Sequence, residues 1–184
     1  MRHRSSLALA SLSALLAGPV AAEVTASSES GFVSRNEVEV PLAPEQTWAL
    51  MLEPTWWNPA HSYSGSAANM SIEPEAGGCF CETVPGRNEA APGEVEHMRV
   101  IQIVPGSLLR MRGGLGPLQA EAVTGVITMT VEPAPSGSKI VWEYVIGGYM
   151  RPSMTAMAPV VDRVVSEQLS RLAQLARSGA VGPE

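Results

Sequence analysis

The sequence predicts an α+β domain in which an antiparallel sheet packs against one long C-terminal helix. Between residues 31 and 149 most of the chain consists of short segments in which apolar and polar side chains alternate, separated by turns rich in Gly and Pro. This pattern is typical of antiparallel strands. Over residues 153–177 the spacing changes to intervals of three and four, as on one face of a helix. The apolar residues with this spacing are Ala158, Val161, Val165, Leu169, Leu172 and Ala176.

The first strand is expected at residues 34–40. Pro44 then opens a short helix that ends at Pro54, because a proline disfavours helical geometry in the residue before it. Residues 56–59 suggest a second short helical turn or a tight loop. Six further strands are expected at residues 69–73, 79–83, 94–104, 108–112, 123–132 and 139–146. These elements make a seven-stranded antiparallel sheet with two short helices between strands 1 and 2.

The two ends of the long helix have recognisable signals. Ser153 is a suitable N-cap, and Gly179 is a typical stop signal. Pro159 fits either the first turn of this helix or a kink inside a longer one. No other long helix is expected in the chain, so this one must cover the sheet.

The first 22 residues have the pattern of a secretory signal peptide. Arg2 and Arg4 are followed by an apolar run over residues 7–16, and residues 20–22 (VAA) form a small-residue cleavage signal. We expect cleavage after Ala22 and export to a periplasm or to the outside of the cell. The run is too short to span a bilayer comfortably. The expected organisation is a signal peptide (1–22), a flexible tether (23–32), one domain (33–177) and a tail (178–184).

The composition excludes several classes of partner. The chain has 18 acidic and 12 basic residues and a formal net charge of −6, without a basic cluster. Such a charge argues against binding to nucleic acid or to anionic membrane surfaces. No second apolar run of spanning length follows the leader, so no membrane span is expected after processing.

The order of elements and five local stretches resemble the START-like (SRPBCC, Bet v 1-like) superfamily. The stretches are residues 57–65 (WNPAHSYSG), 68–74 (ANMSIEP), 77–82 (GGCFCE), 112–118 (RGGLGPL) and 161–169 (VDRVVSEQL). They look like exported bacterial members that are similar to the domains of Hsp90 ATPase activator homologues and polyketide cyclases. The resemblance implies the helix-grip fold, in which a seven-stranded antiparallel sheet curves around the long C-terminal helix. It covers about residues 33–177.

The helix-grip fold implies a cavity between the sheet and the long helix. Large or pliable side chains that could line it lie on inward strand positions, the short helices and the helical stripe, although such residues also simply complete a core. The candidate ligand-binding residues are Trp56, Trp57, His61, Tyr63, Cys79, Cys81, Met111, Trp142, Tyr144, Met154 and Met157.

Three residues are candidates for catalysis, although no catalytic residue is assigned. His61 and Tyr63 lie two apart before a strand, where a histidine could orient a ligand or act as a general acid or base; it could equally be a loop histidine bonded to a carbonyl. Glu82 is the third. His97 lies in the middle of a strand, where burial and exposure are equally consistent with its neighbours.

Cys79 and Cys81 are two residues apart on a strand and should therefore share one face of the sheet. In an extended chain their Cα atoms lie about 6.6 Å apart, at the far edge of what a disulfide accepts. They could be small buried residues, a strained disulfide, or soft metal ligands with a nearby histidine. We predict that they point inward, unligated and not bonded to each other, so no metal site is expected.

The expected function is binding of a small apolar or amphipathic ligand in the cavity, without turnover and without a cofactor. The sequence has no phosphate-binding loop and no Gly-x-Ser-x-Gly elbow, so neither ATPase activity nor hydrolase chemistry of that type is supported. Two alternatives remain open. One is an enzyme of cyclase, dehydratase or hydrolase type that uses the same cavity. The other is a protein-binding module of the Hsp90-activator type.

Overall fold

Eight strands form one antiparallel sheet in the structure, a computed structural model that describes residues 20–88 and 90–180. The strand order is β1-β2-β8-β7-β6-β5-β4-β3. The strands are β1 (Ala21–Ser28), β2 (Gly31–Val40), β3 (Met70–Ile72), β4 (Cys79–Val84), β5 (Gly93–Val104), β6 (Leu108–Gly113), β7 (Ala122–Ala134) and β8 (Gly137–Tyr149). All seven predicted strands are present, which confirms the α+β class; β1 is additional.

The long C-terminal helix α2 (Met154–Ser178) has the predicted ends. The Ser153 hydroxyl accepts a hydrogen bond from the amide of Ala156, and Gly179 ends the helix with a left-handed φ of 71°. Pro159 lies inside the helix, beyond the first turn. No helix within residues 20–88 and 90–180 is long and apolar enough to cross a membrane.

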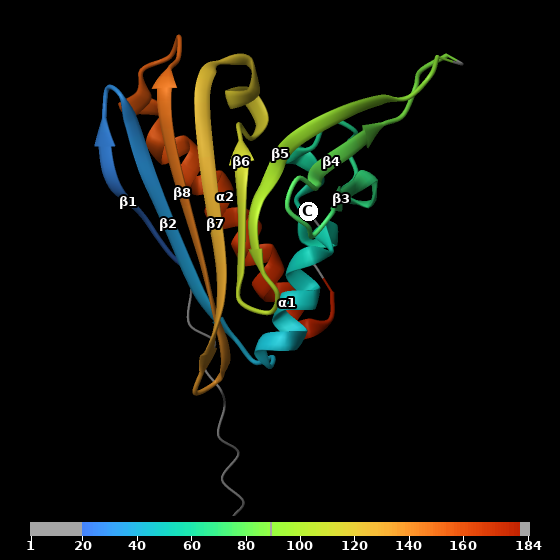
Figure 1. Cartoon of the computed structure of the whole chain (residues 1–184), viewed down its shortest axis with the longest axis vertical. Coiled ribbons are helices and arrows are strands. Elements are labelled where there is room, and N and C mark those ends of the chain that lie inside the picture. The colour runs from blue at the N-terminus through green and yellow to red at the C-terminus, as the bar shows by residue number, and fades with distance from the viewer. Residues whose placement is uncertain (1–19, 89, 181–184) are drawn as a thin grey trace, which may run out of the picture.

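The sheet curves around α2, as the helix-grip fold requires. Figure 1 shows α2 running obliquely behind the strands β8, β7 and β6, while β5, β4 and β3 bend away on the other side. The concave face carries the core. Trp142 and Tyr144 of β8 and Leu169 and Leu172 of α2 are all at most 1% exposed there, because the apolar stripe of the helix is buried against the alternating inward residues of the strands.

Most of β1 and the first two residues of β2 lie in the segment predicted as a flexible tether (23–32). Strand β1 pairs with β2 from Ala21↔Glu37 to Ser28↔Gly31 and forms one edge of the sheet. Its side chains are mostly small or polar, and all but Val24 are exposed, so no alternation of apolar residues marks it in the sequence. Its backbone groups nevertheless find partners on β2. Residues 1–19 of the predicted leader lie outside the described residues.

The second short helix is replaced by three short 3₁₀ turns. Only α1 (Pro44–Leu52) is an α-helix in the connection between β2 and β3; η1 (Pro54–Trp56), η2 (Pro59–His61) and η3 (Ala67–Asn69) follow it. Pro54 and Pro59 each begin a turn. Both prolines lack an amide hydrogen and disfavour helical geometry in the preceding residue, which prevents one continuous helix.

The prediction that Cys79 and Cys81 point inward and remain unbonded is wrong. The two residues form a disulfide, and their Cα atoms are 5.4 Å apart, closer than in a fully extended strand. Phe80 and Glu82 are buried on the concave face, so alternation places both cysteines on the outer face. The contraction of β4 between them brings the sulfurs within bonding reach.

A bulge in β5 places His97 on the inner face. Phe80 of β4 is opposite Met98, but the next residue, Cys81, is opposite Glu96, so His97 is the extra residue. Strict alternation would put His97 and Met98 on opposite faces, whereas both are at most 2% exposed. The sequence did not decide whether His97 is buried or exposed, and the structure shows that it is buried.

The disulfide predicts a simple result for thiol titration. Protein unfolded without reductant should show no reactive thiol, and reduced protein should show two. Replacing both cysteines with serine should lower the free energy of unfolding by about 1–2 kcal/mol, the loop-closure entropy expected for so short a loop. Two free thiols in the unreduced protein would contradict this assignment.

Candidate ligand-binding site

A cavity of about 460 Å³ opens between α2 and two loops. One wall belongs to the N-terminal half of α2, the second to Trp57 and η2, and the third to the start of η4 (Gly116–Ala120); Tyr144 lies between them. The lining residues are Trp57, Ala60, His61, Ser62, Tyr63, Leu115, Gly116, Pro117, Leu118, Tyr144, Met157, Val160, Val161, Val164 and Val165. Most of these side chains are apolar.

Tyr144 holds the loop that forms the third wall. Its hydroxyl donates a hydrogen bond to the carbonyl of Gly113 (3.1 Å) and accepts one from the amide of Leu115 (3.2 Å). Burial raises the pKa of Tyr144 well above its usual range, so the phenol keeps its proton and its donor role. Gly125 makes room for it, because a Cβ there would lie 2.5 Å from the hydroxyl oxygen.

His61 connects η2 to α2 at the rim of the cavity. Its Nε2 lies 3.3 Å from a carboxylate oxygen of Glu167, whose other oxygen accepts a hydrogen bond from the side chain of Asn58. Both members of the His61–Glu167 pair are partly exposed. The pair adds to the buried hydrogen bond from the Asn58 amide to Gln168 (2.8 Å), which also joins this loop to α2.

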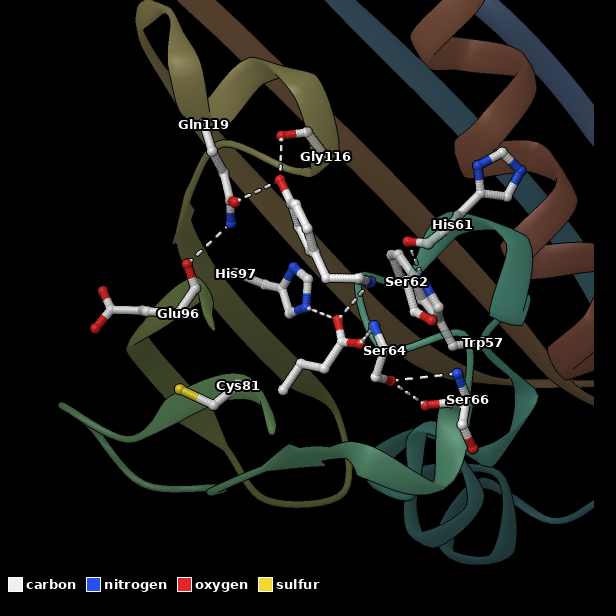
Figure 2. Close-up of polar contacts among 12 residues, drawn as sticks. Trp57, His61, Ser62, Ser64, Ser66, Cys81, Glu96, His97, Gly116 and Gln119 are labelled. Atoms are coloured by element: carbon white, nitrogen blue, oxygen red, sulfur yellow. Dashed lines mark hydrogen bonds and ion pairs between the residues drawn. The ribbon is translucent and has the colours of Figure 1, made fainter. Parts of the chain in front are cut away.

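Tyr63 connects the same loop to η4. The side chain is 52% exposed, and its hydroxyl lies 2.9 Å from Oε1 of Gln119 and 3.2 Å from the carbonyl of Gly116. Gln119 in turn donates a hydrogen bond to the carbonyl of Glu96 on β5. Figure 2 shows Gln119 between Glu96 and the Gly116 loop, and His61 apart from them beside α2.

Glu82 and His97 form a buried pair beneath this loop. A carboxylate oxygen of Glu82 lies 2.9 Å from Nε2 of His97, and neither side chain is more than 2% exposed. The same carboxylate accepts hydrogen bonds from the backbone amides of Tyr63 (3.1 Å) and Ser64 (2.5 Å). Glu82 therefore fixes the loop that carries Tyr63.

The protonation of the pair follows from these contacts. Burial alone would raise the pKa of Glu82, but the hydrogen bonds from Ser64, Tyr63 and His97 outweigh it, and the pKa is lowered. Burial lowers the pKa of His97, and the opposing effect of the neighbouring Glu82 carboxylate does not compensate. Near neutral pH the pair thus consists of an ionised carboxylate and a neutral imidazole.

The structure distributes the sequence-predicted site residues over four places. Trp57, His61, Tyr63, Tyr144 and Met157 line the cavity. Four others are buried in the core outside the cavity lining: Trp56, Met111, Trp142 and Met154. Cys79 and Cys81 lie on the outer face, away from the cavity. Glu82 is buried behind Tyr63 and does not line the cavity.

Sequence reasoning missed the valines and the 115–118 loop as lining residues. Val161 and Val165 belong to the recognised helical stripe, so their position was available, but a stripe does not reveal which of its residues border a cavity. Leu115 and Pro117 carry no local signal of their role. Within residues 20–88 and 90–180, no group of three or more His, Cys, Asp or Glu side chains could hold a metal ion.

Comparison with protein families gives one match, to the family described as "Polyketide cyclase / dehydrase and lipid transport", over residues 31–177. The chain belongs to this family. The match confirms the resemblance to the START-like (SRPBCC) superfamily. Among proteins with curated descriptions, none matches the chain.

Solved structures of the family fold are similar to this chain. A conserved protein of unknown function from Enterococcus faecalis has a TM-score of 0.57 and 14% identity, covering 90% of this chain and 81% of its own. An uncharacterised protein from Rhizobium leguminosarum has a TM-score of 0.56 and 16% identity, and the match covers 86% of this chain and 98% of that protein. A protein from Mesorhizobium loti has a TM-score of 0.53 and 17% identity, and the match covers 78% of this chain and 95% of that protein. These likenesses concern the fold.

The Glu82–His97 pair predicts how stability depends on pH. Both pKa values are lowered in the native protein, so the unfolded chain takes up these protons first as the pH falls. The contribution of His97 to the free energy of unfolding should be fully present above its ordinary pKa of 6.5. It should decrease as the pH falls towards the lowered pKa of the native protein. His97→Gln should therefore reduce the loss of unfolding free energy between about pH 7 and about pH 5.5 in urea titrations.

Tyr63→Phe, which lacks only a hydroxyl group, is the control. Its unfolding free energy should decrease between these pH values as much as that of the wild type. An equally steep loss in His97→Gln would show that other groups cause it.

Proposed function

We propose that the protein binds a small apolar or amphipathic molecule in the cavity between α2, η2 and η4. The observation that carries the proposal is the cavity itself, whose walls consist mainly of valine, leucine, methionine and aromatic side chains from three separate elements. Its volume of about 460 Å³ lies within the usual range of small-molecule sites. The description of the family, which includes lipid transport, supports the same class of ligand.

Binding without turnover is favoured because the polar side chains around the cavity are hydrogen-bonded to other groups of the protein. The His61 ring is paired with Glu167, and the Tyr63 hydroxyl is hydrogen-bonded to Gly116 and Gln119. These contacts connect loops to one another and to α2. Among the lining residues, His61, Tyr63 and Tyr144 are the titratable side chains, and each is already hydrogen-bonded to a protein group. A cavity of this size also argues against a module with a filled interior that acts through its outer surface.

A cavity-filling substitution tests the proposal. Wild-type protein should bind the neutral fluorescent probe N-phenyl-1-naphthylamine with a dissociation constant in the micromolar range, because the probe is apolar and fits the cavity. Val161→Trp should weaken this binding by at least about tenfold, because the indole ring would occupy the cavity next to α2. Probe fluorescence in a titration measures both constants.

Arg163→Trp is the matched control, since Arg163 is exposed on the same helix and does not line the cavity. It should bind the probe like wild type. Equal weakening in both variants, or unchanged binding in Val161→Trp, would contradict binding in this cavity.

We also propose that the protein acts outside the cytoplasm. The leader pattern in residues 1–22 supports export, and the Cys79–Cys81 disulfide supports an oxidising compartment, where such bonds persist. After cleavage behind Ala22, residues 23–28 of β1 would keep their partners on β2.

Export with processing predicts the N-terminus of the mature protein. The intact mass of protein isolated from the producing cells should correspond to a chain that starts at Glu23 and contains one disulfide. A full-length chain that stays in the cytoplasmic fraction would contradict the proposal.

A further inference from the structure

His97 carries a buried acceptor atom that no group in the described part of the chain uses. Its Nε2 is bonded to Glu82, but its Nδ1 has no hydrogen-bond partner within residues 20–88 and 90–180. Because Glu82 is ionised and can only accept, the imidazole proton resides on Nε2. The lone pair of Nδ1 is therefore available to accept a hydrogen bond. A buried acceptor without a partner costs free energy, so this atom requires an explanation.

The surroundings of His97 fit the recognition of an apolar molecule. The ring is 2% exposed and lies among three aromatic rings, with centroid distances of 5.1 Å to Phe80, 6.0 Å to Tyr63 and 6.5 Å to Trp57. Trp57 and Tyr63 also line the ligand cavity. His97 thus lies directly behind two side chains of the cavity wall.

A second cavity reaches His97 from the other side. It has a volume of about 510 Å³ and is lined by His97 together with Gly113, Gly114, Leu118 and Gln119, among others. Leu118 lines both cavities. In Figure 2 the nitrogen of His97 that is not bonded to Glu82 is on the side of the ring where Gln119 and Gly116 are drawn. Tyr63 and Leu118 therefore separate the ligand cavity from His97.

We propose that Nδ1 of His97 accepts a hydrogen bond from a hydroxyl group of the ligand, so that the preferred ligands are apolar molecules with a neutral alcohol or phenol group. Glu82 acts as a positioning residue that fixes the tautomer and orientation of the ring. This inference rests on the proposed function, since it assigns the polar end of the molecule bound in the ligand cavity.

The charges around His97 explain why the group should be a neutral donor. A carboxylate or phosphate on the ligand would face the lone pair of Nδ1 and the nearby Glu82 carboxylate, and Glu94 and Glu96 line the second cavity. A charged group would also lose its hydration among apolar side chains. A hydroxyl group avoids both penalties and supplies the missing donor.

Tyr63 is the side chain that gives way to the ligand. It is 52% exposed, so its hydroxyl can exchange the contacts with Gly116 and Gln119 for water when the ring turns outward. Its backbone stays in place, because the amide of Tyr63 remains bonded to the buried Glu82 carboxylate.

A matched pair of probes tests the proposal with the full mature protein. 2-Naphthol carries the hydroxyl group, whereas 2-methoxynaphthalene has the same ring system and no donor. Wild-type protein should bind 2-naphthol about 3- to 10-fold more tightly in fluorescence titrations, the effect of one added hydrogen bond to a buried acceptor. In His97→Gln the side-chain amide can still donate to Glu82 but has no acceptor at the position of Nδ1. This variant should bind both probes with the affinity that wild type shows for 2-methoxynaphthalene.

The outcomes separate this inference from the proposed function. Equal affinity of wild type for the two probes would overturn the role of His97 while leaving ligand binding in place. Equal weakening of both probes in His97→Gln would indicate a merely structural role and would also overturn it. If neither probe binds wild type, the proposed function fails and the inference fails with it. His61→Gln, the matched change at the cavity rim, should leave the ratio of the two affinities unchanged.

A measurement on wild type covers the case in which His97→Gln does not fold. In ¹⁵N NMR spectra of histidine-labelled protein, Nδ1 of His97 should have the shift of an unprotonated ring nitrogen. This shift should change on addition of 2-naphthol in the direction of a hydrogen-bonded nitrogen, and it should stay in place with 2-methoxynaphthalene. The same response to both probes would contradict the proposal.

Discussion

The burial of α2 against the concave face of the sheet is the interaction on which the rest of the structure depends. In its C-terminal half, Leu169, Leu172 and Ala173 are fully buried and fill the space above the strands. In its N-terminal half, the helix presents Val161 and Val164, which are shorter than leucine and remain partly exposed. The same helix thus closes the core at one end and leaves a cavity at the other. Binding space and stability are supplied by different turns of one element.

Glu82 has a comparable role for the loop on the other side of the cavity. A buried carboxylate is tolerated only when its oxygens have partners, and here they are supplied by His97 and by the backbone of residues 63 and 64. The position of Tyr63, and with it one wall of the cavity, therefore follows from the need to satisfy one charged group in the core.

The sequence predicted those features that arise from local periodicity. The seven strands and both ends of α2 follow from alternation, helical spacing, Ser153 and Gly179. The edge strand β1 could not be predicted, because its pairing with β2 involves backbone groups rather than an apolar pattern. The position of His97 depends on a bulge, and the disulfide depends on a local contraction of β4. One of the three cavity walls comes from residues 115–118, whose position is set by the distant Tyr144.

The pairing between β5 and β6 ends at Arg99↔Arg112, whereas β5 itself continues back to Gly93. Beyond that point β5 still pairs with β4, and it is linked to η4 through the side chain of Gln119, which donates a hydrogen bond to the carbonyl of Glu96. Figure 1 shows β5, β4 and β3 diverging from the other strands. Backbone pairing is consequently continuous across β2, β8 and β7, whereas it is interrupted between β5 and β6 before Arg99. The side of the sheet opposite α2's N-terminal half is therefore joined to the rest of the molecule by side-chain contacts as well as by strand pairing.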